Sequence, residues 1–341
     1  MKTLNMKKIV NDNIVAYGVH DCLLEFNWFD YQLKNFWGKP ISKFHIKNRF
    51  HKFCFLSFAS TEHIVSLAYV DIGLARSFFG YVFEKNKGMV KHWEKTIVSR
   101  KFKFNNDFDN SIISFTNPQF NIYNQTNLQE NFIKGNFSCK DNVNISYDVE
   151  LGLVQKPLRT INPADFDHWV FTQKRCGLKL RNIKIEVDGA TITVNPDNTI
   201  CNIDYSGGFF RRDTNWLWAS AGGHDKGNTY GFNFAIFNNN ELYGENATWF
   251  NNEREHYKRI MFDWNANDLT KPIRIYTDDK RVELSFSILG EKADVKSRGF
   301  GAIKTNFHQY IGTFNGYIHI NKKKQKISNV LGILEMHKSL W

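Results

Sequence analysis

Long apolar segments and helix-forming runs are both missing from this chain of 341 residues. No window approaches the roughly 18 consecutive apolar residues of a membrane-spanning helix. The first residues carry charge but no apolar stretch of signal-peptide length, so we expect neither a spanning helix nor a secretory leader. Extended runs of Ala, Leu and Glu are absent and Pro occurs only 6 times, which favours strands over helices.

Cysteine is scarce and irregularly spaced. The five residues are Cys22, Cys54, Cys139, Cys176 and Cys201. Their number is odd, and no Cys-x-x-Cys pair occurs. This pattern fits reduced thiols better than a disulfide scaffold, and we therefore expect a cytoplasmic protein.

The signatures of several common chemistries are also missing. The sequence has no phosphate-binding Gly-x-x-x-x-Gly-Lys-Ser/Thr loop and no His-Glu-x-x-His. It has no Gly-x-Gly-x-x-Gly after a strand and no nucleophile elbow. We therefore expect neither a cofactor nor a metal ion, and phosphoryl transfer, nicotinamide redox chemistry and zinc hydrolysis are disfavoured.

The net charge of +11 has no concentrated source. Lys residues are spread along the whole chain, and the dense clusters are Lys101 with Lys103 and residues 322–324 with Lys326. We interpret most of this charge as a solvated surface rather than a nucleic-acid interface. Transient contact with an anionic membrane surface stays open as an alternative.

Aromatic residues in alternating patterns are what the chain has in abundance. They make up 16% of the residues, far more than a disordered chain carries. Alternating apolar and polar runs, each followed by a turn rich in Asn, Asp or Gly, predict strands. Asp188-Gly189 stands between two such runs and predicts a hairpin, because both turn residues need positive φ. Strands are expected at residues 52–60, 62–71, 77–84, 143–151, 179–187, 191–194, 230–237 and 241–250.

The length predicts two domains, because a single hydrophobic core rarely serves so long a chain. Residues 156–166 carry two prolines and show no clear alternation, so we interpret them as the connection between the halves. Residues 28–37 show helical spacing and predict a short helix or an irregular lid. We expect an N-terminal β-barrel-like domain at 1–160 and a C-terminal one, carrying the site, at 161–341.

Residues 202–250 combine charged, polar and aromatic side chains on three expected strands. Because strand side chains alternate between faces, Arg212, Trp216 and Trp218 share one face and Arg211 lies on the other. We interpret the Trp face as the interior of a barrel. An Arg there must be paired, because an isolated buried charge is very costly.

Two nearby carboxylates, Asp204 and Glu245, are the expected partners of Arg212. One interpretation is a structural network, in which the Arg packs across Trp and is held by an acid. The other is a site, in which an acid in an aromatic pocket has a raised pKa and donates a proton. On the second interpretation Asp204 and Glu245 are candidate catalytic residues. The candidate ligand-binding residues are Arg211, Arg212, Trp216, Trp218, Asn233, Tyr243, Asn246 and Trp249.

Several motifs carry a resemblance to a known family. They are Asp204-Tyr-Ser-Gly-Gly, Arg211-Arg212-x-x-x-Trp216-x-Trp218-Ala219, Gly231-Phe-Asn233, Glu245-Asn246-Ala247-x-Trp249 and a closing Gly332-Ile-Leu-Glu335 before Trp341. With them the chain resembles the family called domain of unknown function twenty-eight-oh-four (DUF2804). That family is similar in fold to two-barrel calycin proteins such as carotenoid hydratases and tocopherol cyclase-like proteins. The resemblance implies a mainly β fold of two antiparallel lipocalin-like (calycin) barrels in tandem, with little helix and a hydrophobic ligand.

Three functions remain open at this point. The first is binding of a hydrophobic small molecule, of the lipid or isoprenoid class, in a barrel cavity. The second is a cofactor-independent hydratase, cyclase or isomerase with a buried carboxylate as general acid. The third is a structural or interaction protein with a filled core. A cavity beside Asp204, Arg212 and Glu245 would argue against the third, and a cavity carboxylate without an Arg partner would favour the enzyme.

Overall fold

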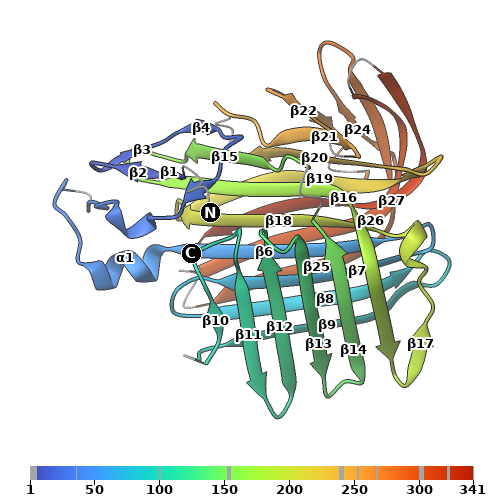
Figure 1. The fold of residues 1–341 in the computed structure, drawn as a ribbon, viewed down its shortest axis with the longest axis horizontal. Coiled ribbons are helices and arrows are strands. Elements are labelled where there is room, and N and C mark those ends of the chain that lie inside the picture. The colour runs from blue at the N-terminus through green and yellow to red at the C-terminus, as the bar shows by residue number, and fades with distance from the viewer. Residues whose placement is uncertain are drawn as a thin grey trace.

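The computed structural model describes residues 6–35, 37–99, 101–151, 155–237, 242–251, 253–265, 268–298, 303–320 and 323–340. This part of the chain is mostly β, as predicted (Figure 1). Its helical elements are one α-helix and two short 3-10 turns: α1 (Lys43–Arg49), η1 (Trp28–Asp30) and η2 (Pro196–Asn198). None of its helices is both long and apolar enough to cross a membrane.

Fourteen of the described strands form one sheet, and its main path runs β10-β11-β12-β13-β14-β16-β18-β6-β7-β8-β9. Of the remaining strands, β15 and β17 pair with β16, and β4 pairs with β15. The bounds are β4 (Gly18–Val19), β6 (His51–Ala59), β7 (His63–Asp71), β8 (Arg76–Glu84), β9 (Gly88–Ile97), β10 (Lys103–Phe104), β11 (Ile112–Asn117), β12 (Phe120–Asn127), β13 (Phe132–Cys139), β14 (Val143–Glu150), β15 (Leu158–Pro163), β16 (Trp169–Val187), β17 (Ala190–Ile192) and β18 (Ile200–Phe209).

Nine more strands form a second antiparallel sheet in the order β22-β21-β20-β19-β27-β26-β25-β24-β23. Its bounds are β19 (Asp213–Asp225), β20 (Asn228–Phe237), β21 (Asn246–Phe250), β22 (Glu253–Tyr257), β23 (Met261–Asp263), β24 (Ile273–Tyr276), β25 (Val282–Arg298), β26 (Ile303–Ile320) and β27 (Lys323–Leu340). Near the N-terminus two small pairs complete the fold: β1 (Lys7–Lys8) with β5 (Leu24–Glu25), and β2 (Val10–Asn11) with β3 (Ile14–Val15).

The first sheet curls over an aromatic core. In Figure 1 its strands β11–β14 cross in front of β6–β9. Phe78 on β8 contacts Phe120 across this interior, with ring centroids 4.9 Å apart, and Trp93 on β9 stacks on Phe137 at 4.9 Å. The second sheet encloses a separate core that includes Phe232, Phe234, Phe286 and Phe314. Two curled half-barrels in tandem thus confirm the predicted fold class.

A third core lies between the two sheets. Phe55 on β6 and Tyr81 on β8 face Trp218 on β19 and Ile311 on β26 in this layer. Phe55 and Trp218 meet edge to face at 5.2 Å. Each sheet therefore buries both of its faces at this point, which explains why β6 and β7 are apolar almost throughout.

The chain passes from the first sheet to the second between Phe209 and Asp213. The strands β15 to β18 therefore belong to the first sheet by pairing, although they follow residue 160. The predicted division into domains at 160/161 concerns which parts of the chain fold independently, and strand pairing in the intact protein does not test this. It stays a prediction.

Most strand predictions are confirmed, and two local predictions are not. Asp188 and Gly189 have φ of 52° and 81°, as the hairpin requires. Residues 156–166, interpreted as a connection, contain strand β15. Pro163 is tolerated there because it is the last residue of the strand, where a missing backbone N–H does not interrupt the pairing. The described residues of 28–37 form a 3-10 turn at Trp28–Asp30 and no α-helix, so the short helix is not confirmed, and the alternative of an irregular lid stays a prediction. All five cysteines are free thiols.

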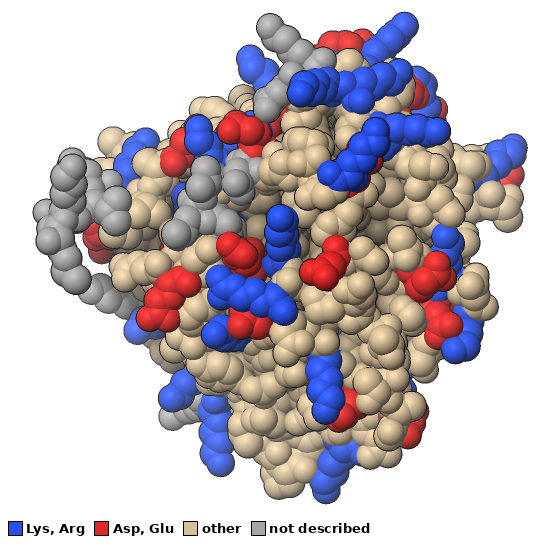
Figure 2. Space-filling model, turned by 45° about the vertical axis from the view of Figure 1, so that its right-hand side comes forward, with Lys and Arg blue, Asp and Glu red and all other residues tan. Residues whose placement is uncertain are grey.

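Charges of both signs are mixed over the surface. On the face shown in Figure 2, Lys and Arg side chains lie next to Asp and Glu side chains over much of the area. Lys91 pairs with Asp188 at 2.9 Å and Arg274 with Glu283 at 2.6 Å. This mixture agrees with the solvated-surface interpretation of the net charge.

Candidate functional site

A cavity of about 320 Å³ lies between the two sheets. Its walls come from β6, β7 and β8 of the first sheet and from β19, β20 and β27 of the second, with contributions from β16, β18 and β25. Aromatic and aliphatic side chains make up much of the lining, including Phe55, Ala68, Phe79, Phe210, Trp216, Trp218, Ala235, Phe237 and Phe307. Apolar side chains form most of the exposed wall, but the lining also includes many polar and charged residues, among them Lys174, Asp204, Glu245, Glu335, Glu94 and Lys292.

The two tryptophans of β19 face this cavity. Trp216 and Trp218 line it, whereas Ala219 and Ala221 belong to the core of the second sheet. The alternation predicted from the sequence is therefore present. The interpretation of the Trp face as a barrel interior is wrong, because the odd-numbered residues of β19 face the concave side of their sheet and the tryptophans face the other sheet.

The buried cation beside Asp204 and Glu245 is Lys174, not Arg212. Lys174 on β16 is directly opposite Asp204 on β18, donates to its Oδ2, and lies 3.5 Å from Glu245 Oε2. Its ammonium is 5.7 Å from the Trp218 ring centroid. Burial lowers the pKa of Lys174, but the two carboxylates outweigh this and hold the pKa above its usual range. Burial raises the pKa of Glu245, and the nearby ammonium of Lys174 offsets this rise only in part.

The predicted placement of Arg212 is therefore corrected. Arg212 is exposed in the bend before β19, which begins at Asp213. The alternation of β19 does not extend back to it, because the chain is changing sheets there. Arg211 lies near the surface, 3.8 Å from Asp165. Neither arginine lines the cavity.

Asn233 and Asn246, two of the predicted ligand-binding residues, contact residues of the cavity wall or their strands rather than the cavity itself. Asn233 accepts from Trp218 Nε1 at 2.7 Å and donates to the Glu245 carbonyl at 2.6 Å, so it fixes the indole and the segment that carries Glu245. Asn246 accepts from the backbone of Ala235 at 2.8 Å. Asn233 and Asn246 are buried and outside the cavity lining.

Tyr243 and Trp249 also lie away from the cavity lining. The backbone of Tyr243 exchanges two hydrogen bonds with the Asn162 side chain, at 2.9 and 3.0 Å. Trp249 donates to the carbonyl of Lys156 at 3.0 Å. Both anchor the second sheet to the β15 region of the first.

A third carboxyl group, Glu335 on β27, was not among the predicted site residues. Its Oε1 accepts from Trp216 Nε1 and its Oε2 from Gln309 Nε2, both at 2.6 Å. Burial raises the pKa of Glu335 to about 7, although these two hydrogen bonds lower it in part. In the sequence the signals for Glu335 were its place in the closing Gly332-Ile-Leu-Glu335 motif of the family and a strand face shared with Ile333.

His337, two residues further along β27, completes this wall. Its ring stacks on Trp216 with centroids 3.8 Å apart, and its Nε2 lies 2.5 Å from Ser339 Oγ. Burial lowers the pKa of His337 to about 3. The imidazole is therefore neutral across the physiological range.

The mouth of the cavity carries charges from both sheets. Lys292 on β25 donates to Glu94 on β9 at 2.9 Å, and Lys296 donates to the other oxygen of Glu94. Asp294 pairs with Lys296 at 2.7 Å. Burial alone would raise the pKa of Glu94, but the two ammonium groups bring it below its usual range. These ion pairs bridge the two sheets.

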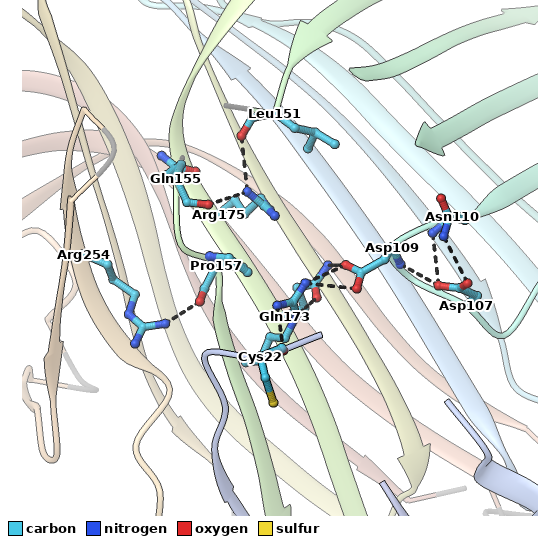
Figure 3. Close-up of polar contacts among 11 residues, drawn as sticks. Cys22, Asp107, Asp109, Asn110, Leu151, Gln155, Pro157, Gln173, Arg175 and Arg254 are labelled. Atoms are coloured by element: carbon cyan, nitrogen blue, oxygen red, sulfur yellow. Dashed lines mark hydrogen bonds and ion pairs between the residues drawn. The ribbon is translucent and has the colours of Figure 1, made fainter. Parts of the chain in front are cut away.

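A second group of buried polar residues lies apart from this cavity (Figure 3). Arg159 donates to both oxygens of Asp109 at 2.8 and 3.0 Å, and Gln173 donates to the same carboxylate at 3.2 Å. Arg175 donates to two backbone carbonyls at 2.8 and 3.2 Å. The buried charges of Arg159 and Asp109 thus compensate each other, as a structural role requires. Among the described residues no group of His, Cys, Asp and Glu forms a candidate metal site.

Residues 22–341 match the family model described as Domain of unknown function (DUF2804). The chain belongs to this family. The resemblance identified from the sequence motifs is thereby confirmed. None of the curated proteins compared by sequence matches significantly.

Solved structures with the same fold include two proteins of distant sequence. Kievitone hydratase from Nectria haematococca is 11% identical, with a TM-score of 0.51 over 85% of this chain and 88% of that one. CghA with Sch210972 is 7% identical, with a TM-score of 0.53 over 89% and 90%. A second structure of CghA is 8% identical, with a TM-score of 0.52 over 97% and 95%. At these identities the likeness establishes the two-barrel, calycin-like fold alone.

Proposed function

We propose that this DUF2804 protein binds a largely apolar small molecule in the cavity between its two sheets. The observation that carries the proposal is a cavity of about 320 Å³ whose exposed wall is mostly aromatic and aliphatic, with polar and charged side chains set into it. Ligand pockets have this composition and a volume of this order. A protein with a filled core, the third possibility left open by the sequence, would have no such space.

The proposal is tested by titration with N-phenyl-1-naphthylamine, whose fluorescence rises in apolar surroundings. We expect saturable binding to the wild type and its loss in Ala235→Phe, because Ala235 lines the cavity and is buried. Ala190→Phe on the exposed strand β17 is the matched control and retains binding. If Ala235→Phe does not fold, Ala75→Phe in the turn at the mouth of the cavity fills the same space. Binding that survives both cavity variants would refute the proposal.

A second candidate is a cofactor-independent hydratase, cyclase or isomerase. The observation that favours it is Glu335, a cavity carboxyl group with no Arg or Lys within ion-pair distance among the described residues. A neutral carboxylic acid in an apolar site is a competent general acid. Incubation with a metabolite extract in heavy water should then transfer solvent deuterium into at least one compound. An extract unchanged relative to one treated with heat-denatured protein would argue for binding alone.

A further inference from the structure

Glu335 is held in one orientation by groups from three other strands. Trp216 of β19 and Gln309 of β26 each donate an N–H to a different carboxyl oxygen at 2.6 Å. The Gln309 carbonyl accepts from Tyr81 of β8 at 2.7 Å, which turns the Gln309 amide N–H towards Glu335. Each carboxyl oxygen thus already receives one hydrogen bond, from the half-buried Trp216 and from the buried Gln309.

The charge balance around Glu335 differs from that of the neighbouring acids. Asp204 and Glu245 share the ammonium of Lys174. The described residues give Glu335 neither a cation within ion-pair distance nor a third hydrogen-bond partner, and its exposed fraction is 6%. Burial therefore raises its pKa to about 7, so that the neutral acid is abundant near neutral pH.

A neutral Glu335 has one O–H, and its side chain lines the cavity, where a ligand could accept it. We propose that Glu335 presents a carboxylic acid O–H to the cavity, and that the ligand is a neutral, largely apolar molecule with a carbonyl oxygen. This inference rests on the proposed function, because it requires a molecule in the cavity. A carbonyl oxygen accepts a hydrogen bond and has no proton of its own. It would therefore supply the acceptor that the O–H of Glu335 needs.

The same geometry serves a proton-transfer step. The O–H bond of Glu335 breaks and a new O–H bond forms at the carbonyl oxygen of the ligand. The resulting carboxylate keeps the two N–H donors of Trp216 and Gln309, which stabilise its charge. The proton returns to Glu335 when the carbonyl re-forms, so no oxidant or reductant is consumed.

The groups that face Glu335 leave it as the principal titrating group near neutral pH. The pKa of His337 lies at about 3, and burial raises that of Tyr81 far above neutral. Lys174 is held as an ammonium beside Asp204, and at the mouth Lys292 is paired with Glu94. The remaining group is Glu245, whose pKa is also raised, and the test separates it from Glu335 by substitution.

The test uses two ligands that differ in a single group, 2-acetylnaphthalene and 2-ethylnaphthalene. Each competes with N-phenyl-1-naphthylamine for the full-length protein at about pH 6 and about pH 8, on either side of the pKa of Glu335. We expect the affinity for the ketone, relative to the hydrocarbon, to fall about tenfold between these two conditions, because the protonated fraction falls by about that factor. The affinity for the hydrocarbon stays constant.

Variants assign the effect to one residue. Glu335→Gln, whose amide donates at any pH, should bind the ketone without pH dependence, and Glu335→Leu should lose the preference for the ketone at both pH values. Glu283→Gln, on the second sheet and outside the cavity lining, is the matched control and behaves as the wild type. A pH dependence that persists in Glu335→Gln, or that disappears in Glu245→Gln instead, overturns the inference.

The two proposals fail in different ways. If the wild type binds neither the fluorescent probe nor the two naphthalenes, the proposed function fails. If it binds both naphthalenes with a ratio that does not change with pH, the cavity binds ligands but Glu335 is not the donor. The wild-type measurement needs no variant, so it decides the point even if the substitutions at Glu335 prevent folding.

Discussion

The side chain of Lys174 compensates two acids of the cavity wall, the half-buried Asp204 and the buried Glu245. Asp204 and Glu245 reach the inner wall of the cavity from β18 and from the segment before β21. Lys174 is 3% exposed and contacts both. Removing one partner of a buried ion pair leaves an uncompensated charge, which costs more than the intact pair contributes.

Lys174→Met should therefore destabilise the protein by about 3–5 kcal/mol. Lys184→Met is a matched control on the same strand: Lys184 pairs with Glu186 at 2.7 Å on the surface, where solvent screens the ion pair and its loss should change the stability little. Urea unfolding followed by tryptophan fluorescence measures both. Adding Asp204→Asn and Glu245→Gln to Lys174→Met should recover part of the loss. Equal midpoints for the two Lys variants would show that Lys174 is not compensating buried charge.

At the scale of strands, local pattern predicted several elements, but β11–β13 and β25–β27 lie outside the expected ranges. The alternation at residues 52–60, 62–71 and 77–84 corresponds to β6, β7 and β8. Pattern was not enough where pairing partners decide the outcome. β15 has little alternation because it is buried along most of its length, between β4 and β16. A buried strand of this kind is not distinguishable from a connection by periodicity.

The candidate site shows the same limit more sharply. Sequence reasoning identified Asp204, Glu245 and Trp218, which the structure brings together on the cavity wall. It missed Lys174, because that residue becomes the partner of Asp204 only through the register of β16 with β18. It missed Glu335 as a site residue for a similar reason, since β27 reaches the cavity only by pairing with β19.

Close backbone approach explains how strands of different sheets hold the cavity in place. A Cβ added at Gly231 of β20 would lie 2.6 Å from the backbone of Cys176 on β16, and Gly177 beside it has φ of +74°. Only glycine allows such an approach and such a backbone conformation. This contact joins the strand of Lys174 to the strand of Asn233, so it fixes the buried ammonium relative to the indole of Trp218.

For the whole molecule, the cavity is a property of both sheets together. Phe55 and Phe79 come from the first sheet, whereas Trp218, Glu335 and His337 come from the second. The ion pairs of Glu94 with Lys292 and Lys296 connect the sheets again at the mouth. A ligand held between the sheets would therefore stabilise their association, because it binds only the assembled state.

Fragments test where the chain divides. A fragment of residues 1–160 lacks β16 and β18, which in the intact sheet lie between β14 and β6, so its two halves have no strands to connect them. We expect it to lack stable β structure. A fragment of residues 1–210 contains every described strand of the first sheet and should show a β-type circular dichroism spectrum. It should also bind apolar dyes, because the layer that normally covers Phe55 and Tyr81 is missing.

The comparison decides between two boundaries. A stable 1–160 fragment with cooperative thermal unfolding would support the division at 160/161 predicted from the sequence. Folding of 1–210 alone would instead place the boundary where the chain changes sheets, between residues 209 and 213. Failure of both fragments would mean that the layer between the sheets is needed for either sheet to form. The cavity would then belong to a single cooperative unit, and substitutions in its lining would change global stability as well as binding.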